Sequence, residues 1–525
     1  MPRTPLTVDT AVQFFPRGGS AFVVKYLNQH LMARGVRTNV ICGSLGKPGQ
    51  ASHAATFYQG LPIAPYDYNS AAAAHASGLS SMDGQRAPFH PSFEDRGPAA
   101  PDTQATAVAP ATFIHLINVW HRHLARHRSA SPDIVHLHHL SHLQQAALYA
   151  YPNTPRVTTL HGTDLNLLHQ AHAIRALAER AGTDPDHLAD TLPPAPDERA
   201  AVLSALAHEH GFGDDDAHHL TATDWRLWRH TTSWITSMQR WARHAGHLVT
   251  VSAGDRAEAR HLLGVDEEHI TVIGNGADLT RFIPRDLTTA ERFAHLRRWL
   301  VEDPRGWAPG QQPGTIRYSD HDLERLRDHH GHLRPMVLWI GRYQKVKRLS
   351  LLMEAFAAAM REVNPAPALL LWGGAPGECE GEHPLRTAQR LGIDKNVYVI
   401  GWRGHDELPL GLACADLMAA PAVGESFGMV YVEAMACGVP PIATHTGGPA
   451  DFIVSSGPQA NGWTVRPDDP HHLASALQEA LINPGERARR GRNAAALAHS
   501  TYGWPTVVNR YQALYERLRR SASSA

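Results

Sequence analysis

The feature that most constrains the fold is an alternation of short apolar runs with helix-length stretches, which occurs twice along the chain. The apolar runs predict strands at 8–15, 38–42, 134–138, 157–161, 248–252 and 270–273, and again at 335–340, 368–372, 397–400, 417–420, 441–444 and 463–465. Stretches between them predict helices, for example at 22–34, 349–363, 384–391 and 471–482. This alternation is typical of parallel sheets with helices on both faces. We therefore expect an α/β protein of two doubly wound halves, with a ligand site beyond the carboxyl ends of the strands.

The same pattern predicts the domain organisation and leaves three segments outside it. We expect an N-terminal domain over 1–285, an interdomain segment over 286–334, a C-terminal domain over 335–505, and a final helix over 506–525 that packs back on the N-terminal domain. Residues 49–102 are rich in Ala, Ser, Pro, Gly and His and are expected to form a long loop. Residues 171–247 have a mostly helical pattern with four tryptophans, and this segment forms either a lid or acceptor wall at the site or a helical packing face.

Composition excludes several classes of protein. The 525 residues are 43% hydrophobic and carry a net charge of −1, so no bulk charge attracts nucleic acid or an anionic membrane. No run of about 18 apolar residues predicts a membrane span, and no apolar signal region follows Met1, so we expect a cytoplasmic protein. The four cysteines show no metal-binding spacing and are expected to be free thiols.

A basic loop follows the strand predicted at 335–340 and precedes the helix predicted at 349–363. It contains Arg342 and Lys347. A strand, a basic loop and a helix together form an arrangement that grips phosphate, because Arg offers a bidentate fork, Lys a mobile charge and the helix its first N–H groups. Taken alone, the loop could equally be a solvated basic turn.

Two glutamates flank the start of another predicted helix. Glu425 and Glu433 have seven residues between them, and the helix is expected to begin near Met429 and to end at Gly438. A helix N-terminus between two carboxylates suits a ligand with an anion and several hydroxyls, such as a nucleotide-sugar diphosphate. The structural alternative is a capping Glu425 with a surface Glu433.

These motifs resemble the retaining GT-B glycosyltransferases of family 4, whose hallmarks are Glu-x7-Glu and Arg-x4-Lys. Further family-like phrases are Asn275-Gly276-Ala277-Asp278 with Phe282, Gly447-Gly448-Pro449-Ala450-Asp451, and Trp504. The resemblance covers most of 5–48, 131–165, 246–285 and 334–518, and leaves the segments 49–102, 171–247 and 287–333 outside. It implies two Rossmann-like domains that face each other across a cleft, the first on the acceptor side and the second binding the nucleotide sugar.

The resemblance also implies roles for residues of the second half. Arg342 and Lys347 would hold the donor diphosphate and stabilise the leaving group. Glu433 would bind the ribose hydroxyls, and Glu425 would contact the transferred sugar. The remaining donor contacts would come from the backbone N–H groups near the start of the helix and from the loop that meets the nucleobase: Gly428, Met429, Val430 and Arg403.

In the first half, Gly18 and Gly19 follow the first predicted strand, where glycine lets backbone approach a ligand closely. The resemblance places this loop over donor and acceptor, and it places His161, at the end of the strand at 157–161, against the transferred sugar. Simple turn chemistry is the alternative for the glycines. One strand earlier, His136, His138 and His139 either line the acceptor side or are core histidines.

The implied reaction is front-face substitution with retention, catalysed by a hexosyltransferase that needs no metal ion and no cofactor. Asp214-Asp215-Asp216 is expected to be a solvated turn and not a metal site, and Arg342 and Lys347 would take the role of the metal. The donor would be a UDP- or GDP-sugar.

The acceptor is expected to be a soluble small molecule or sugar of secondary metabolism. A membrane-bound acceptor stays an alternative, because His121, Arg122, Arg126 and Arg128 lie on one basic stretch of modest charge. A GT-B epimerase or phosphorylase and a catalytically inactive sugar-binding protein are the competing functions. The oligomeric state is open.

Overall fold

The computed structural model describes residues 5–524, which form two compact units. Of these residues, unit 1 comprises 5–273 and 508–524, and unit 2 comprises Gly274–Val507. Residues 274–285, which the sequence pattern assigns to the N-terminal domain, therefore belong to unit 2. They are held there because Ala277 donates a hydrogen bond to the carbonyl of Tyr502 (2.7 Å), while the Trp504 ring occupies the space beside Gly276.

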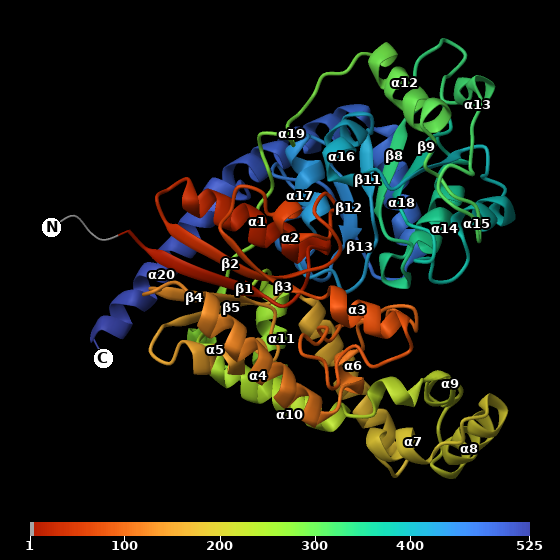
Figure 1. Cartoon of the computed structure of the whole chain (residues 1–525). Helices are drawn as coiled ribbons and strands as arrows, with labels where there is room; N and C mark the ends of the chain where they lie inside the picture. Colours follow the sequence, from red (N-terminus) through yellow and green to blue (C-terminus); the bar gives the residue numbers. More distant parts are fainter. Residues whose placement is uncertain (1–4, 525) are drawn as a thin grey trace. The chain divides into compact units, whose positions relative to one another are not determined.

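Unit 1 is built on a parallel sheet of seven strands in the order β3-β2-β1-β4-β5-β6-β7 (Figure 1). The strands are β1 Thr7–Val12, β2 Arg37–Ser44, β3 Ile63–Asp67, β4 Ile134–His138, β5 Arg156–Thr159, β6 His247–Thr250 and β7 Ile270–Val272. The chain turns from one side of β1 to the other between β3 and β4, so the switch point of the sheet lies between β1 and β4. This confirms the doubly wound α/β class for the first half.

The expectation of a long loop over 49–102 is wrong in part. This segment contains helix α2 Ala54–Phe57, strand β3 Ile63–Asp67 and helix α3 Asn69–Ala76, and β3 pairs with β2 at the edge of the sheet. The strand was hidden because its buried positions alternate with exposed ones and because Pro65 interrupts its apolar pattern. Proline is tolerated in a strand at a sheet edge.

Helices cover both faces of the unit 1 sheet, and α4, α5 and α10 lie side by side on one of them (Figure 1). The larger helices are α1 Gly18–Met32, α4 Pro110–His127, α5 Leu143–Ala150, α6 Thr163–Arg180, α10 Thr231–His244 and α11 Ala253–Leu263. The final helix α20, Trp504–Ser524, begins in unit 2 and belongs to unit 1 from Val508 on. Its Tyr515 hydroxyl lies 2.7 Å from Nδ1 of His136 in the sheet.

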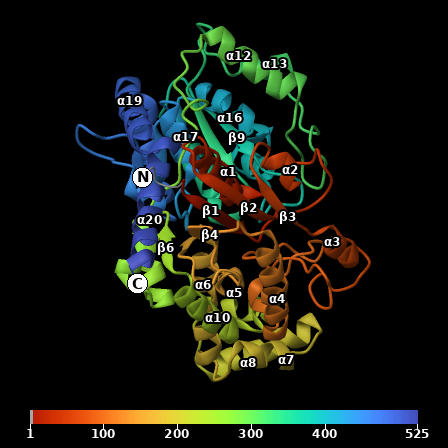
Figure 2. The ribbon, with the colours of Figure 1, turned by 60° about the vertical axis from the view of Figure 1, so that its left-hand side comes forward.

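The segment 171–247 is helical, and its tryptophans form packing faces. After α6 come α7 Pro185–Thr191, α8 Pro196–Glu209, α9 Asp214–Ala222 and α10; Figure 2 shows α7, α8 and α10, and Figure 1 shows α9. Trp228, Trp234 and Trp241 are buried in the main core of unit 1, whereas Trp225 is buried in a small separate core with Leu188 and Leu203. Since all four rings are buried, they do not form an exposed lid surface.

The expectation of a solvated turn at Asp214, Asp215 and Asp216 is wrong in part: the side chains are exposed or half-exposed, but the backbone is helical. These residues form the first turn of α9, where acidic side chains are favourable because the N-terminus of a helix carries partial positive charge. Asp216 also pairs with Arg180 at 2.8 Å.

Unit 2 contains a parallel sheet of six strands in the order β10-β9-β8-β11-β12-β13. The strands are β8 Met336–Gly341, β9 Ala368–Gly373, β10 Val397–Gly401, β11 Leu417–Ala419, β12 Pro441–Thr444 and β13 Trp463–Val465. Its helices include α14 Leu349–Ala359, α15 Pro384–Leu391, α16 Gly404–Ala413, α17 Met429–Ala436, α18 Pro470–Ile482 and α19 Pro484–Thr501. The second half is therefore also a doubly wound, Rossmann-like unit, as predicted.

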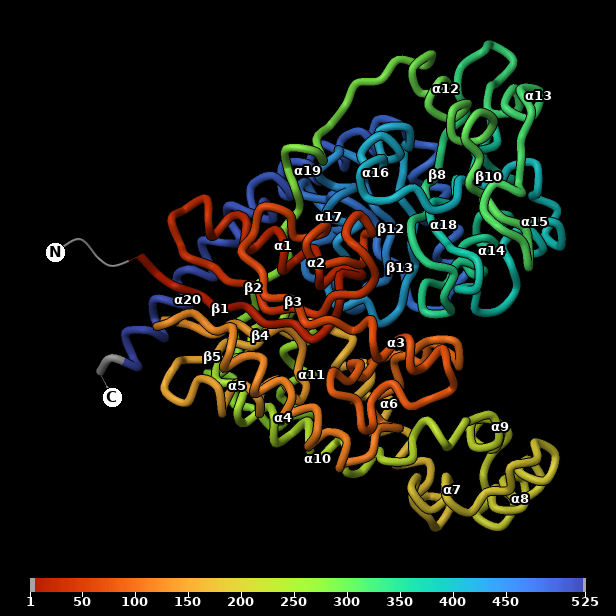
Figure 3. Tube along the Cα trace, viewed as in Figure 1, coloured from red at the N-terminus to blue at the C-terminus, as the bar shows by residue number. Residues whose placement is uncertain are grey.

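The segment between the two predicted domains folds as part of unit 2. It runs through α12 Thr289–Arg297, a π-helical turn Arg298–Glu302 and α13 Asp320–Glu324 before it enters β8 (Figure 3). Arg292 of α12 donates to the carbonyl of Cys414 and pairs with Asp416 at 3.1 Å. Over residues 5–524, no helix is both long and apolar enough to cross a membrane.

Candidate functional site

The basic loop of unit 2 lies between the carboxyl end of β8 and the start of α14, and it contains Lys347. A 3-10 turn, Lys345–Lys347, leads into α14. The residue that joins turn and helix, Arg348, has a left-handed backbone (φ 51°), and its guanidinium pairs with Asp468 at 2.6 Å. Arg348 thus holds the turn, while Nζ of Lys347 lies 2.6 Å from Oε2 of Glu425. The structure therefore brings together two side chains that the sequence motifs assigned to the same ligand.

Glu425 lies in the loop that leads into α17, and the N-terminus of that helix is uncapped by any side chain. The N-cap residue is Gly428, with φ 86°, and a Cβ there would lie 2.5 Å from the ring of Tyr431. Only glycine fits such a position. The carbonyl of Glu425 accepts a hydrogen bond from the N–H of Gly448 (2.7 Å), which ties this loop to the segment that follows β12. The first N–H groups of α17, at Met429 and Val430, therefore stand at an N-terminus suited to an anion.

Glu433 lies in the second turn of α17 and is only 2% exposed. Its Oε1 lies 2.7 Å from Nε2 of His405 at the start of α16. The His405 ring also packs on Phe282, with ring centroids 5.0 Å apart. The alternative of a surface Glu433 is thus wrong, because the residue is buried. A buried carboxylate needs a hydrogen-bond donor, and His405 supplies one.

Sequence reasoning missed His405 and did not give Phe282 a role. The available signals were weak. Phe282 belongs to the family-like phrase that begins at Asn275, and His405 follows strand β10 by four residues. In a chain with 36 histidines, position alone could not distinguish His405 from the others.

The side chain of Arg403 does not face a ligand site. Its guanidinium is fully buried, pairs with Asp303 at 3.0 Å and donates to the carbonyls of Trp299 (2.8 Å) and Asp303. It therefore anchors the π-helical turn at 298–302. Its side chain is therefore not available to a ligand, whereas the neighbouring Trp402 is exposed.

In unit 1, Gly18 and Gly19 begin helix α1 and are exposed. Gly18 has φ 64°, and no atom lies within 4 Å of where its Cβ would be. The preceding Arg17 makes no cap with its side chain; it pairs instead with Asp102 at 2.8 Å. The N-terminus of α1 is thus a second open helix end, and Arg17 ties it to the segment after α3.

His161 follows the carboxyl end of β5, and its Nε2 lies 2.9 Å from Nδ1 of His138. His161 is partly exposed, whereas His136, His138 and His139 are buried. Burial lowers the pKa of His161 to about 3 and that of His138 and His139 well below the usual range. These rings are therefore neutral near pH 7, and the three buried ones are core histidines behind His161.

Next to this group, Asp164 is a buried carboxyl that accepts a hydrogen bond from the N–H of Leu140 (3.0 Å). Burial raises its pKa to about 6. Over residues 5–524, no group of three or more His, Cys, Asp or Glu side chains is arranged to hold a metal ion.

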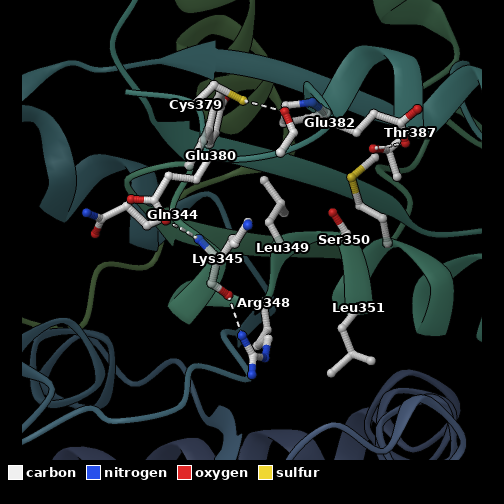
Figure 4. A pocket seen from close by; sticks show the side chains of 14 residues that line it. Gln344, Lys345, Arg348, Leu349, Ser350, Leu351, Cys379, Glu380, Glu382 and Thr387 are labelled. Carbon is white, nitrogen blue, oxygen red and sulfur yellow. Dashed lines mark hydrogen bonds between the residues drawn. The ribbon is translucent and has the colours of Figure 1, made fainter. Parts of the chain in front are cut away.

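A cavity of about 300 Å³ lies beside the basic loop of unit 2 but is a separate feature (Figure 4). It is lined by Lys345 and Arg348 from the turn and by Cys379, Glu380 and Glu382 from the loop after β9. Arg342, Lys347, Glu425 and Glu433 do not line it.

Two family models match the chain. One, described as Glycosyl transferases group 1, matches residues 324–497, which contain Arg342, Lys347, Glu425 and Glu433. The other, described as Glycosyltransferase Family 4, matches residues 89–281, which contain His161.

Several curated relatives are named D-inositol 3-phosphate glycosyltransferase. The protein of Salinispora arenicola is 30% identical over 285 residues, which are 51% of this chain and 56% of the relative. That of Segniliparus rotundus is 28% identical over 282 residues, or 53% and 60% of the two chains. The chain thus spans somewhat more than half the length of these relatives.

Solved structures share the fold. Sucrose-phosphate synthase of Thermosynechococcus elongatus superimposes with a TM-score of 0.58 at 16% identity, over 98% of this chain and 100% of that one. Starch Synthase IV of Arabidopsis thaliana, in its catalytic domain bound to ADP and acarbose, has the same TM-score and identity over 99% and 100%. HepE of Anabaena, in complex with UDP, has a TM-score of 0.55 at 16% identity over 98% and 100%.

Proposed function

We propose that this chain, which belongs to the family 4 glycosyltransferases of the GT-B type, transfers a sugar from a nucleotide-diphosphate sugar to an acceptor. The observation that carries the proposal is the meeting of Lys347 and Glu425, 2.6 Å apart, beside the open N-terminus of α17. A cation, a carboxylate and free N–H groups in one place match the diphosphate and the hydroxyls of such a donor.

In this proposal unit 2 binds the donor. Arg342, Lys347 and the first N–H groups of α17 hold the diphosphate, and Glu425 accepts hydrogen bonds from the sugar hydroxyls. Glu433 accepts hydrogen bonds from the ribose. The nucleobase lies against the loop of Trp402 and Arg403, through backbone and the exposed indole ring.

The reaction would proceed with retention. The bond from the anomeric carbon to the diphosphate oxygen breaks, and the acceptor oxygen attacks the same face of the sugar. The acceptor proton passes to the departing phosphate, whose charge Arg342 and Lys347 stabilise. Neutral His161, held by His138, contacts the transferred hexose without acting as nucleophile. We propose no metal ion for this reaction, because the two cations take its role.

UDP or GDP is the proposed nucleotide, and UDP is the first to test because HepE was solved with UDP. A soluble small acceptor is proposed, and the name of the curated relatives, which denotes an inositol phosphate, supports this class. The four free cysteines, Cys42, Cys379, Cys414 and Cys437, suit a reducing compartment, so a cytoplasmic location is part of the proposal.

A thermal-shift screen with UDP, GDP, ADP and TDP tests the donor site. A ligand that binds only the folded protein increases the free energy of unfolding, by about 2.7 kcal/mol at a ligand concentration of one hundred times its Kd. The melting temperature rises as a result. We expect one diphosphate to give the largest shift; the absence of a shift with all four would contradict the proposal. With the matching sugar donor, release of free diphosphate separates a transferase from an inactive binding protein, and a change of sugar configuration without release would indicate an epimerase.

A further inference from the structure

The buried carboxylate of Glu433 forms a hydrogen bond with a side chain from a different helix. Nε2 of His405, at the start of α16, lies 2.7 Å from Oε1 of Glu433 on α17. Side-chain exposure is 19% for the histidine and 3% for the glutamate. Since an ionised carboxylate can only accept, the histidine nitrogen is the donor. The rotamer of Glu433 therefore depends on a residue 28 positions away in the sequence.

His405 is itself held in place from the segment at 281–282. Phe282 is fully buried, and its ring packs on the imidazole with centroids 5.0 Å apart. The neighbouring Arg281 pairs with Asp406 at 2.7 Å, next to the histidine in the chain. Phe282 therefore fixes the imidazole ring of His405, and Arg281 fixes the first turn of α16 through Asp406.

We propose that His405 is a positioning residue for Glu433, and that Phe282 holds its ring; this rests on the proposed function, in which Glu433 binds the donor ribose. Nε2 of His405 holds Oε1, so that Oε2 stays directed at the ribose hydroxyls. This gives the family-like phrase from Asn275 to Phe282 a physical role: it ends in the side chain that supports the histidine. His405 does not touch the donor.

One further ionisable side chain interacts with Glu433 at the end of α17. This side chain is Cys437, the C-cap residue of α17, whose thiol is also affected by the charge of Arg285. Burial and the neighbouring Glu433 raise the pKa of Cys437 to about 12, so this thiol adds no negative charge near pH 7. Asp406 faces Arg281 and is exposed, which screens its effect.

The preference for ribose over 2′-deoxyribose tests the proposal. The probes are UDP, GDP and ADP with their 2′-deoxy counterparts, and the Kd of each is measured by calorimetry with the full chain. We expect the wild type to bind the ribonucleotide about tenfold more tightly, the value of one hydrogen bond to a charged group. In His405→Phe, which keeps a ring against Phe282 but lacks the donor, the preference should fall to about onefold to threefold.

Two further variants separate positioning from general loosening. His405→Gln keeps an N–H donor and should retain most of the ribose preference. His499→Phe removes the hydrogen bond from Nε2 of His499 to the carbonyl of Ala436 at the end of α17 (3.1 Å), and should leave the preference unchanged. Should His405→Phe not fold, His405→Leu, which also lacks a donor, takes its place.

The outcomes are distinct. Loss of preference in His405→Phe with retention in His405→Gln supports the positioning role. An unchanged ribose preference in His405→Phe overturns it, as does a wild type that binds both sugars equally. A wild type that binds no nucleoside diphosphate contradicts the proposed function itself.

Discussion

Nζ of Lys347 lies 2.6 Å from Oε2 of Glu425, although the two residues are 78 positions apart in the sequence. Their side chains are 28% and 21% exposed, so the pair is half-buried and moderately screened. Without a donor, each side chain is the counter-charge of the other. In the proposed complex, the ammonium group of Lys347 would interact both with the diphosphate and with Glu425, while Glu425 would accept hydrogen bonds from the sugar hydroxyls.

Lys347→Ala should lower kcat by about a hundredfold to a thousandfold, because a cation aimed at developing charge is lost. The melting temperature should change little, since the pair is partly solvated. Steady-state turnover with the donor found by thermal shift measures the effect. Lys345→Ala is the matched control: the residue lies in the same turn, is exposed and lines the separate cavity, so its variant should keep wild-type turnover. Equal losses in both variants would contradict the role of Lys347.

Glu433→Ala should raise the Kd for the nucleoside diphosphate by about tenfold to a hundredfold, because one or two hydrogen bonds to a charged acceptor are lost. Calorimetry with the free diphosphate measures this without any acceptor. Glu380→Ala, in the wall of the separate cavity, is the control and should bind as the wild type does. A Kd for Glu433→Ala close to that of the wild type would remove Glu433 from the donor site.

Arg403→Met should affect stability more than donor binding. The substitution removes the ion pair with Asp303 and the hydrogen bonds to the carbonyls of Trp299 and Asp303. Unpartnered carbonyls and a loosened turn at 298–302 should cost about 2–4 kcal/mol of the free energy of unfolding. Urea unfolding measures this loss. The KM for the donor should stay within about twofold; a large rise in KM at unchanged stability would show instead that the guanidinium binds the donor.

The buried His142 should make unit 1 less stable at acid pH. Burial lowers its pKa to about 3, whereas in the unfolded chain a histidine titrates near pH 6.5. Between these values the unfolded state binds the extra proton, so the free energy of unfolding falls as the pH falls from 6.5 towards 3.

His142→Leu should remove this contribution. From pH 6.5 to pH 5, the variant should lose about 2 kcal/mol less than the wild type. Urea unfolding monitored by circular dichroism over this range measures the difference, and the values at pH 8, where the histidine is neutral in both states, isolate the effect of packing. Parallel curves for the two proteins would show that His142 does not contribute to the pH dependence.

Some elements were beyond sequence reasoning for identifiable reasons. Strand β3 has an alternating pattern with Pro65 inside it, and only its pairing with β2 makes it a strand. Arg403 occurs in a loop typical of ligand contacts, but the chain supplies Asp303 and two carbonyls from a remote segment as its partners. Local sequence contains no information on such partners.

The two doubly wound halves, and the two motifs that we propose for donor binding, could be predicted from the chain alone, because strand and helix periodicity and the spacing within Glu425–Gly438 are local properties. Tertiary structure decided which charges meet: Lys347 with Glu425, and His405 with Glu433. It also assigned 274–285 to unit 2 and buried the histidines behind His161. These pairings could not be read from local sequence, because the partners follow different strands of a parallel sheet. Only the order of the strands, which depends on the packing of the whole unit, brings their loops to the same edge.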